Sequence, residues 1–241
     1  MDRLTAAYQS ALKQTRHGVA DRVGAVWSQL GSYRDRDIAP FLSRALPVVA
    51  NGQRRAVALT SAYLSRKLDQ GPVGLDAELL VGAAVRNGVA PAEVYARPFA
   101  TVWTALSNGV LIASAIDSGL ARLKATADMD VALSMRDALT AYTGRSEERI
   151  IGWIRVAAPQ CCDYCQNIDG ARTGPDEPQP LHNRCSCTAE PITRMTAADR
   201  SLPLLALGAV IADTVIHSHG ELGPVIGVKG DSFTGPDDLS D

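Results

Sequence analysis

All five cysteines of the chain lie in one short segment, CCDYCQNIDGARTGPDEPQPLHNRCSC. Two of them, Cys162 and Cys165, have the C-x-x-C spacing with which a tight turn directs two thiolates at one tetrahedral ion. After a glycine turn and a proline-rich loop, the pattern H-x-x-C-x-C follows, made by His182, Cys185 and Cys187. The two halves are about one small hairpin apart, a separation at which two pairs of ligands commonly meet on zinc.

The predicted ligands are Cys162, Cys165, His182 and Cys185, with Cys187 as the alternative fourth ligand. A site with four protein ligands has no position open for water or substrate, so the zinc is predicted to be structural. It would stabilise a segment too polar to fold on its own core. Two other interpretations stay open. One is a pair of disulfides with a free thiol, and the other is a dithiol redox site, although no thioredoxin-like pattern surrounds the C-x-x-C.

The rest of the chain must position this segment, and its composition favours helices. Of the 241 residues, 46% are hydrophobic and only 5% are aromatic, while Ala and Leu recur throughout. Apolar residues at helical spacing predict one helix over about 2–30 and another over about 37–68, with a kink or break near Pro47 and Asn51. From Pro98 to Leu123, apolar residues line one broad face, which is the strongest helical signal in the chain.

The pattern changes after residue 144. The run from Ile150 to Val156 favours a β-strand, and Leu222 to Val228 reads as a strand or hairpin arm. The predicted fold is mainly α, with a helical N-terminal region and a small α+β zinc-knuckle module on the C-terminal side. The predicted parts are a helical docking and assembly region over 1–145, the Cys/His metal module over 146–230, and a flexible acidic tail over 231–241.

The charge and hydropathy of the chain bear on its partners. A formal net charge of -2 and an isoelectric point near 6.1 give no global basic field to hold nucleic acid. The longest apolar run, Leu202 to Ala212, is shorter than the roughly 20 residues that a bilayer crossing needs, so no membrane partner is expected. The first ten residues contain no apolar signal segment, and synthesis in the cytoplasm is expected.

The order of features around the cysteines resembles a known family. A strand, C-x-x-C, a glycine turn, a variable loop, H-x-x-C-x-C and then Pro191 are similar to the C-terminal motif of the phage Mu F-like minor head proteins. That family often has Cys-Arg-Cys in the second half, whereas Ser186 replaces the arginine here. The close resemblance covers about residues 150–192. The region before it resembles members from tailed actinobacterial phages only in being long and helical.

The resemblance implies a non-enzymatic structural protein of the phage head, assembled in the host cytoplasm and retained in the virion. It would be associated with the portal vertex or the capsid interior and needed for head morphogenesis. The implied partners are the portal protein, the major capsid protein or both. Self-association through the helices and contact with packaged DNA are further expectations.

Three alternative functions stay open. A zinc-bearing DNA-binding adaptor would use the cations near the cysteines, which are Arg194, Arg200 and Lys229. A metal-dependent nuclease would need a second, open metal site with carboxylates. A capsid maturation protease is less well supported, because His217 and His219, expected to be solvated loop residues, are not accompanied by a Gly-x-Ser-x-Gly or H-E-x-x-H motif.

Overall fold

The structure is a computed structural model, which describes residues 2–146, 150–159, 161–177, 179–182, 185–193, 210–211 and 214–228. The expected acidic tail over 231–241 lies outside the described residues, as do the cations Arg194, Arg200 and Lys229.

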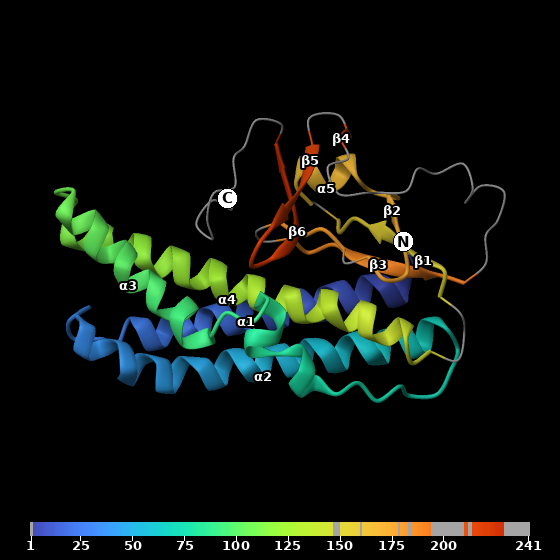
Figure 1. Ribbon diagram of the computed structural model, residues 1–241, viewed down its shortest axis with the longest axis horizontal. Helices are drawn as coiled ribbons and strands as arrows, with labels where there is room; N and C mark the ends of the chain where they lie inside the picture. The colour runs from blue at the N-terminus through green and yellow to red at the C-terminus, as the bar shows by residue number, and fades with distance from the viewer. Residues whose placement is uncertain are drawn as a thin grey trace.

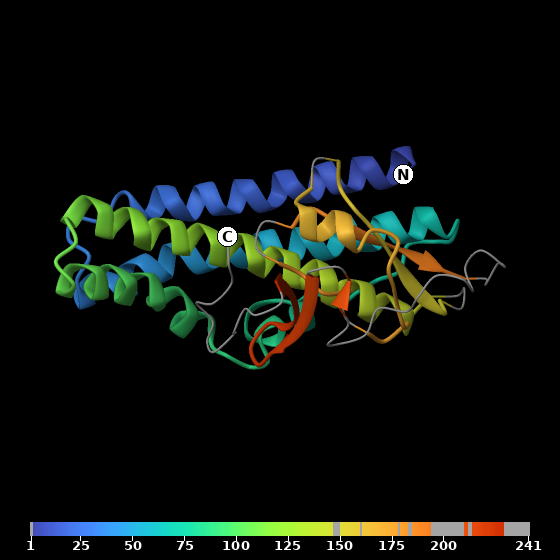
Figure 2. The ribbon, with the colours of Figure 1, turned by 90° about the horizontal axis from the view of Figure 1, so that it is seen from above.

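Four long helices make up the N-terminal region (Figure 1). They are α1 (Arg3–Trp27), α2 (Asp35–Lys67), α3 (Pro91–Ser107) and α4 (Ile112–Thr143), with two short 3-10 helices, η1 (Ala77–Leu80) and η2 (Gly82–Arg86), between α2 and α3. Figure 2 shows α1, α2 and α4 running side by side along the length of the molecule. At one end of this bundle, the rings of Trp27, Phe41 and Phe99 pack edge to face, with centroids 4.8–5.7 Å apart.

Of the predicted kink or break near Pro47 and Asn51, the break is wrong, because α2 is continuous from Asp35 to Lys67. Proline removes one backbone hydrogen bond and disfavours the helix locally. Here, buried residues on both sides of Pro47, including Phe41 and Val49, belong to one apolar stripe that packs against α1 and α4. Packing along the whole helix therefore outweighs the local cost.

The apolar face predicted from Pro98 to Leu123 is divided between two helices. Helix α3 ends at Ser107 and α4 begins at Ile112, and Gly109 between them has a φ of +81°, a left-handed conformation that favours glycine. Pro98 lies inside α3 rather than at its start. The turn leaves Leu111 and Ile112 at 78% and 66% exposed at the tip of the hairpin. No described helix is apolar over enough of its length to cross a membrane.

Gly119 on α4 is placed where another helix approaches closely. A Cβ atom there would lie 2.6 Å from Val102 Cγ2, 2.8 Å from Trp27 Cζ2 and 3.0 Å from the Pro98 carbonyl oxygen. Because overpacked sites typically cost about 1–3 kcal/mol, Gly119→Ala is expected to lower the free energy of unfolding by that amount in urea denaturation. The matched control is Gly18→Ala on α1, where the nearest atom would be 3.7 Å away. Equal stability of the two variants would contradict this packing.

Two small antiparallel sheets follow the helices. The first has the strand order β2-β1-β3, with β1 (Gly152–Val156), β2 (Arg172–Thr173) and β3 (Thr188–Ile192). The second has the order β4-β5-β6, with β4 (Val210–Ile211), β5 (Thr214–His219) and β6 (Gly223–Val228). A short helix, α5 (Asp163–Asn167), lies between β1 and β2 in the chain. The predicted fold class, mainly α with a small strand-containing C-terminal region, is confirmed.

The sheets lie on one side of the helical bundle (Figure 1) and share its core. Trp153, Leu181 and Val225 belong to the same buried cluster as the helix side chains. The turn between β5 and β6 is also held by charge, since Glu221 forms ion pairs with Arg86 and, at 2.9 Å, with Arg97. The predicted boundary near residue 145 falls between α4 and β1, but it remains a prediction that the two parts are separate domains.

Candidate metal centre

Sheet register brings the two halves of the cysteine motif together. Strand β1 is antiparallel to β3, and its last residue, Val156, is opposite Thr188, the first residue of β3. The C-x-x-C therefore follows β1 at the same end of the sheet at which the H-x-x-C-x-C precedes β3. Side chains 17 to 20 positions apart in the chain meet there.

The first half is shaped by α5 and the turn after it. Cys162 is the N-cap residue of α5 and is exposed, while Cys165 lies inside the helix and is buried. Gly170, with a φ of +76°, then turns the chain back, and its amide donates to the Arg155 carbonyl at 3.0 Å. The Asp169 carboxylate accepts from the amide of Ala157 at 2.8 Å. These bonds fix the C-x-x-C against the end of β1.

The second half is held by the other sheet. The Leu181 amide donates to the Pro224 carbonyl at 3.2 Å, and the Ile226 amide donates to the Leu181 carbonyl at 2.8 Å. Strand β6 thus holds the residue before His182 in place. The His182 ring is half-buried, and its Nε2 atom lies 3.0 Å from the sulfurs of both Cys162 and Cys165.

Two overlapping groups of side chains could each hold a metal ion. One consists of Cys162, Cys165 and His182, and the other of Cys165, Cys185 and Cys187. Within each group, the ligand atoms all lie within 4.8 Å of one another. Tetrahedral zinc with bonds of about 2.3 Å to sulfur and 2.0 Å to nitrogen places its ligand atoms roughly 3.5–3.8 Å apart, close to the 3.0–3.6 Å between neighbouring ligand atoms here. The donor chemistry and spacing therefore fit a metal ion, with Cys165 common to both groups.

The five cysteines are all free thiols in the structure. The sulfurs of Cys165 and Cys185 are 3.6 Å apart, whereas a disulfide bond is about 2.05 Å long. Cys187 accepts a hydrogen bond from the amide of Ala158 at 3.3 Å. Cys161 is half-buried and belongs to neither metal-binding group. Which four groups bind the ion remains a prediction.

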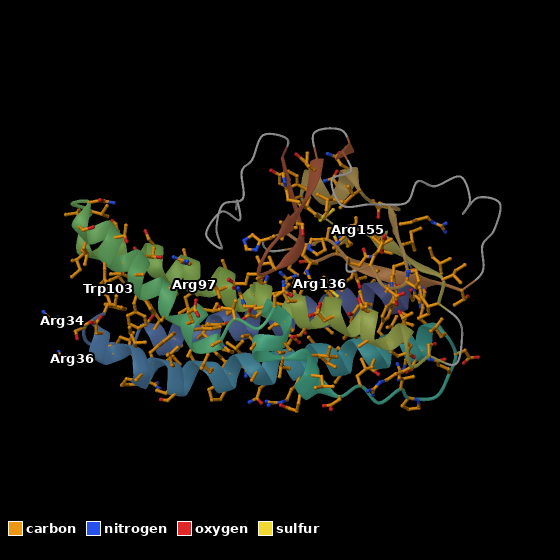
Figure 3. The ribbon with its side chains drawn as sticks, in the orientation of Figure 1. Arg34, Arg36, Arg97, Trp103, Arg136 and Arg155 are labelled. Carbon is orange, nitrogen blue, oxygen red and sulfur yellow. The ribbon has the colours of Figure 1, made fainter. Side chains whose placement is uncertain are left out.

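The buried sulfurs face a buried cation, Arg155 on β1. Figure 3 shows Arg155 within the sheet region, above the helices. One of its Nη atoms donates to the Cys165 sulfur at 3.4 Å and to the Cys185 sulfur at 3.2 Å, and the other donates to the Pro180 carbonyl at 2.7 Å. Burial alone would lower the pKa of Arg155, but the sulfurs of Cys185, Cys165 and Cys187 outweigh it, and its pKa lies above the ordinary value. The guanidinium is thus fully charged, with thiol sulfurs as neighbours.

The same contacts favour a thiolate at the centre of the cluster. The pKa of Cys185 lies well below its ordinary value, first because Cys165 and Cys187 donate hydrogen bonds to its sulfur and also because Arg155 is close. Thiolate, rather than thiol, is the form of cysteine that binds metals. The cluster therefore presents a metal-binding form of Cys185 next to a fixed positive charge.

Replacing Arg155 is expected to weaken metal binding. Hydrogen-bond donors to metal ligands orient those ligands, and their loss typically costs about 10–100-fold in affinity. Arg155→Met removes both bonds to sulfur and the charge, so it should lower zinc affinity by that factor in competition with a chromogenic chelator. Arg155→Lys keeps the charge but lacks the planar guanidinium. Its zinc affinity should lie between those of the wild type and Arg155→Met. Wild-type affinity in Arg155→Met would contradict this role.

Sequence reasoning identified the ligand candidates but missed Arg155. Its only signal in the sequence is a cation between two apolar residues in a predicted strand, Ile154 and Val156. The same pattern is expected of a strand with one face in solvent, where polar and apolar side chains alternate. The sequence therefore does not mark Arg155 as buried. The side chain is buried because it lies on the same face of β1 as the core residue Trp153 and packs against the sulfurs of Cys165 and Cys185.

The two histidines of the HSH sequence lie in a different place from the one expected. They belong to strand β5 rather than to a loop. His219 is buried, and its Nδ1 atom accepts from the amides of Glu221 and Leu222, both at 3.1 Å. This ring therefore organises the turn between β5 and β6. Among the described residues, neither His217 nor His219 belongs to a group that could hold a metal.

No family model, curated protein or solved structure matches the chain. The resemblance to the Mu F-like minor head proteins thus depends on the motif within residues 150–192 and remains a prediction.

Proposed function

We propose that the chain is a non-enzymatic minor head protein of a tailed phage, of the Mu F-like kind, stabilised by one structural zinc ion. The observation that carries the proposal is the meeting of the C-x-x-C and H-x-x-C-x-C side chains at one end of a small sheet that shares its core with a helical bundle. All candidate ligands come from a single short segment, as expected of a structural metal site that stabilises one local region of a protein.

Zinc is the ion that this donor set suits best. Thiolate and imidazole ligands together in tetrahedral arrangement are typical of zinc, whereas magnesium and calcium prefer oxygen. We assign Cys162, Cys165, His182 and Cys185 as the ligands. Cys185 is supported by its contacts with Cys165, His182 and Arg155. Cys187, which also contacts Cys165 and Cys185, is the alternative fourth ligand.

Charge balance also favours zinc over disulfides. Three thiolates and one neutral imidazole around a divalent cation carry a net charge of -1, which the buried Arg155 guanidinium neutralises. A disulfide removes thiolates and would leave that guanidinium buried without a counter-charge, which is costly in a protein interior. The contacts from Arg155 to Cys165 and Cys185 therefore support a metal-bound cluster.

The helices would provide the surface for assembly. Exposed apolar side chains gather at the tip of the α3–α4 hairpin, where Leu106, Val110, Leu111 and Ile112 are 39–78% exposed. Contiguous apolar surface of this kind commonly marks a contact with another protein. We expect this tip to contact the portal or the shell from inside the virion.

The test is made in the phage that encodes the chain. The proposal predicts that purified virions contain the protein and that a null mutant forms few infectious particles. Wild-type protein supplied from a plasmid should restore the titre, whereas a variant lacking the ligand Cys165 should not. A null mutant with normal titre, together with absence of the protein from virions and proheads, would contradict the proposal.

The proposal assigns no enzymatic activity to the chain. The direct test is incubation of the purified protein with supercoiled plasmid in Mg²⁺ or Mn²⁺. The plasmid should remain supercoiled, and nicking that copurifies with the protein would favour the nuclease alternative instead.

A further inference from the structure

Charge is unevenly distributed between the first two helices and the rest of the chain. Residues 3–67, which contain α1 and α2, include eleven lysines or arginines and only three aspartates, a formal charge of +8. The whole chain carries -2, so the other residues together carry -10. The small net charge of the whole chain argued against nucleic-acid binding, but α1 and α2 together are strongly basic.

Three of these cations form a row along α2, which we call the arginine stripe: Arg44, Arg55 and Arg66. They are spaced by 11 residues, so each lies only about 20° around the helix from the previous one and roughly 16.5 Å further along it. All three side chains are exposed. Figure 1 shows α2 along the edge of the bundle opposite the sheets, so the sheets do not cover this helix.

Carboxylates do not neutralise the stripe. Between residues 38 and 67, α2 contains no aspartate or glutamate. Two nearby acidic side chains pair with cations outside the stripe: Glu78 with Arg54 at 2.6 Å and Asp2 with Lys67 at 2.6 Å. Arg44 donates to the neutral side chain of Gln29. Within the described part of the chain, neither Arg55 nor Arg66 forms an ion pair.

The surroundings of the stripe fit a polyanion better than a protein or a bilayer. The exposed large hydrophobic side chains of the described residues lie in η1 and along α3, the following turn and the start of α4, and none lies on α1 or α2. A stable protein interface needs an apolar core, and an interfacial helix needs an apolar face to insert into lipid. Binding to a phosphodiester backbone needs cations placed along its length.

We propose that the arginine stripe binds the phosphate backbone of duplex DNA without reading its sequence. The stripe spans about 33 Å, which is close to the roughly 34 Å of one turn of the double helix, so its arginines can reach phosphates along one turn. This inference goes beyond the proposed function and does not depend on the metal. It also places the DNA-contacting surface on α2, far in the chain from the cations near the cysteines.

The experiment measures binding of the full chain to a fluorescein-labelled 30-base-pair duplex by anisotropy, between 50 and 200 mM NaCl. The test variant is R44Q/R55Q/R66Q. The control, K13Q/R36Q/R145Q, removes three other exposed cations and has the same net charge. Circular dichroism and zinc content, compared with wild type, verify that each variant is folded.

The wild-type protein is expected to bind at 50 mM NaCl and to lose affinity steeply with salt. The test variant should bind at least tenfold more weakly, and the slope of log affinity against log salt should fall by about 2–3, since each phosphate contact contributes about 0.9. The control should change affinity by less than threefold. The proposal would be overturned by absence of wild-type binding, by equal losses in both variants, or by equal competition from polyglutamate, which would indicate an acidic protein partner.

Discussion

Replacing Cys165 with serine is expected to abolish zinc binding and to unfold the sheet region. Cys165 belongs to both groups that could hold a metal ion. Its sulfur lies 3.0 Å from His182 Nε2 and 3.6 Å from the Cys185 sulfur. Serine provides a hydroxyl, which is a far poorer ligand for zinc than a thiolate. We expect at least 1,000-fold weaker zinc affinity, equivalent to about 4 kcal/mol, in chelator competition.

The matched control is Cys161→Ser. Cys161 lies in the same segment and is half-buried, but it belongs to neither metal-binding group. Its replacement should change zinc affinity by less than threefold and leave the thermal unfolding of the sheet region unaltered. If Cys161→Ser and Cys165→Ser lost zinc to the same extent, the ligand assignment would be wrong.

A second large effect is expected in the helical bundle, where Asp128→Asn should lower the free energy of unfolding by about 3–5 kcal/mol. Arg16 on α1 and Asp128 on α4 form a bidentate pair whose side chains are 2% and 8% exposed, with Arg16 Nε 3.0 Å from the carboxylate. Removing one charge from a buried pair leaves the other uncompensated, which accounts for penalties of this size. Urea denaturation followed by circular dichroism measures the change.

The chain offers a close control in the exposed pair between the same two helices. Asp21 on α1 and Lys124 on α4 lie 3.0 Å apart with side chains 74% and 42% exposed. Because solvent screens such pairs, Asp21→Asn should cost less than about 1 kcal/mol. The double variant R16M/D128L replaces the buried pair by apolar side chains and should recover most of the lost stability. A small effect of Asp128→Asn, similar to that of Asp21→Asn, would contradict this account of the pair.

The sequence was sufficient to predict the fold class and the gathering of cysteines and a histidine that could hold a metal ion. Both depend on local patterns, namely apolar spacing for the helices and C-x-x-C with H-x-x-C-x-C for the cluster. The strand before the cysteines was also recognisable, since Ile150 to Val156 contains β1. Local patterns succeed here because the candidate ligands are close in the chain, and one antiparallel strand pair suffices to bring them together.

Features that depend on distant residues could not be predicted in this way. Pro47 suggested a kink or break, but packing of α2 against α1 and α4 keeps the helix from breaking there. The buried pair of Arg16 and Asp128 joins residues 112 positions apart, and no local pattern marks either residue as buried. Arg155 contacts Cys185 across 30 positions, so its role becomes visible only once β1 and β3 are paired.

The most direct test of the central claim is the zinc content of the protein. The measurement is elemental mass spectrometry on protein purified without added metal, together with a count of free thiols in denaturant containing a chelator. The account predicts about one zinc per chain and five free thiols, since the structure has five free cysteines and zinc thiolates are released by chelation. Protein without metal and with fewer than two free thiols would contradict it, because disulfides would then hold the sheet region together.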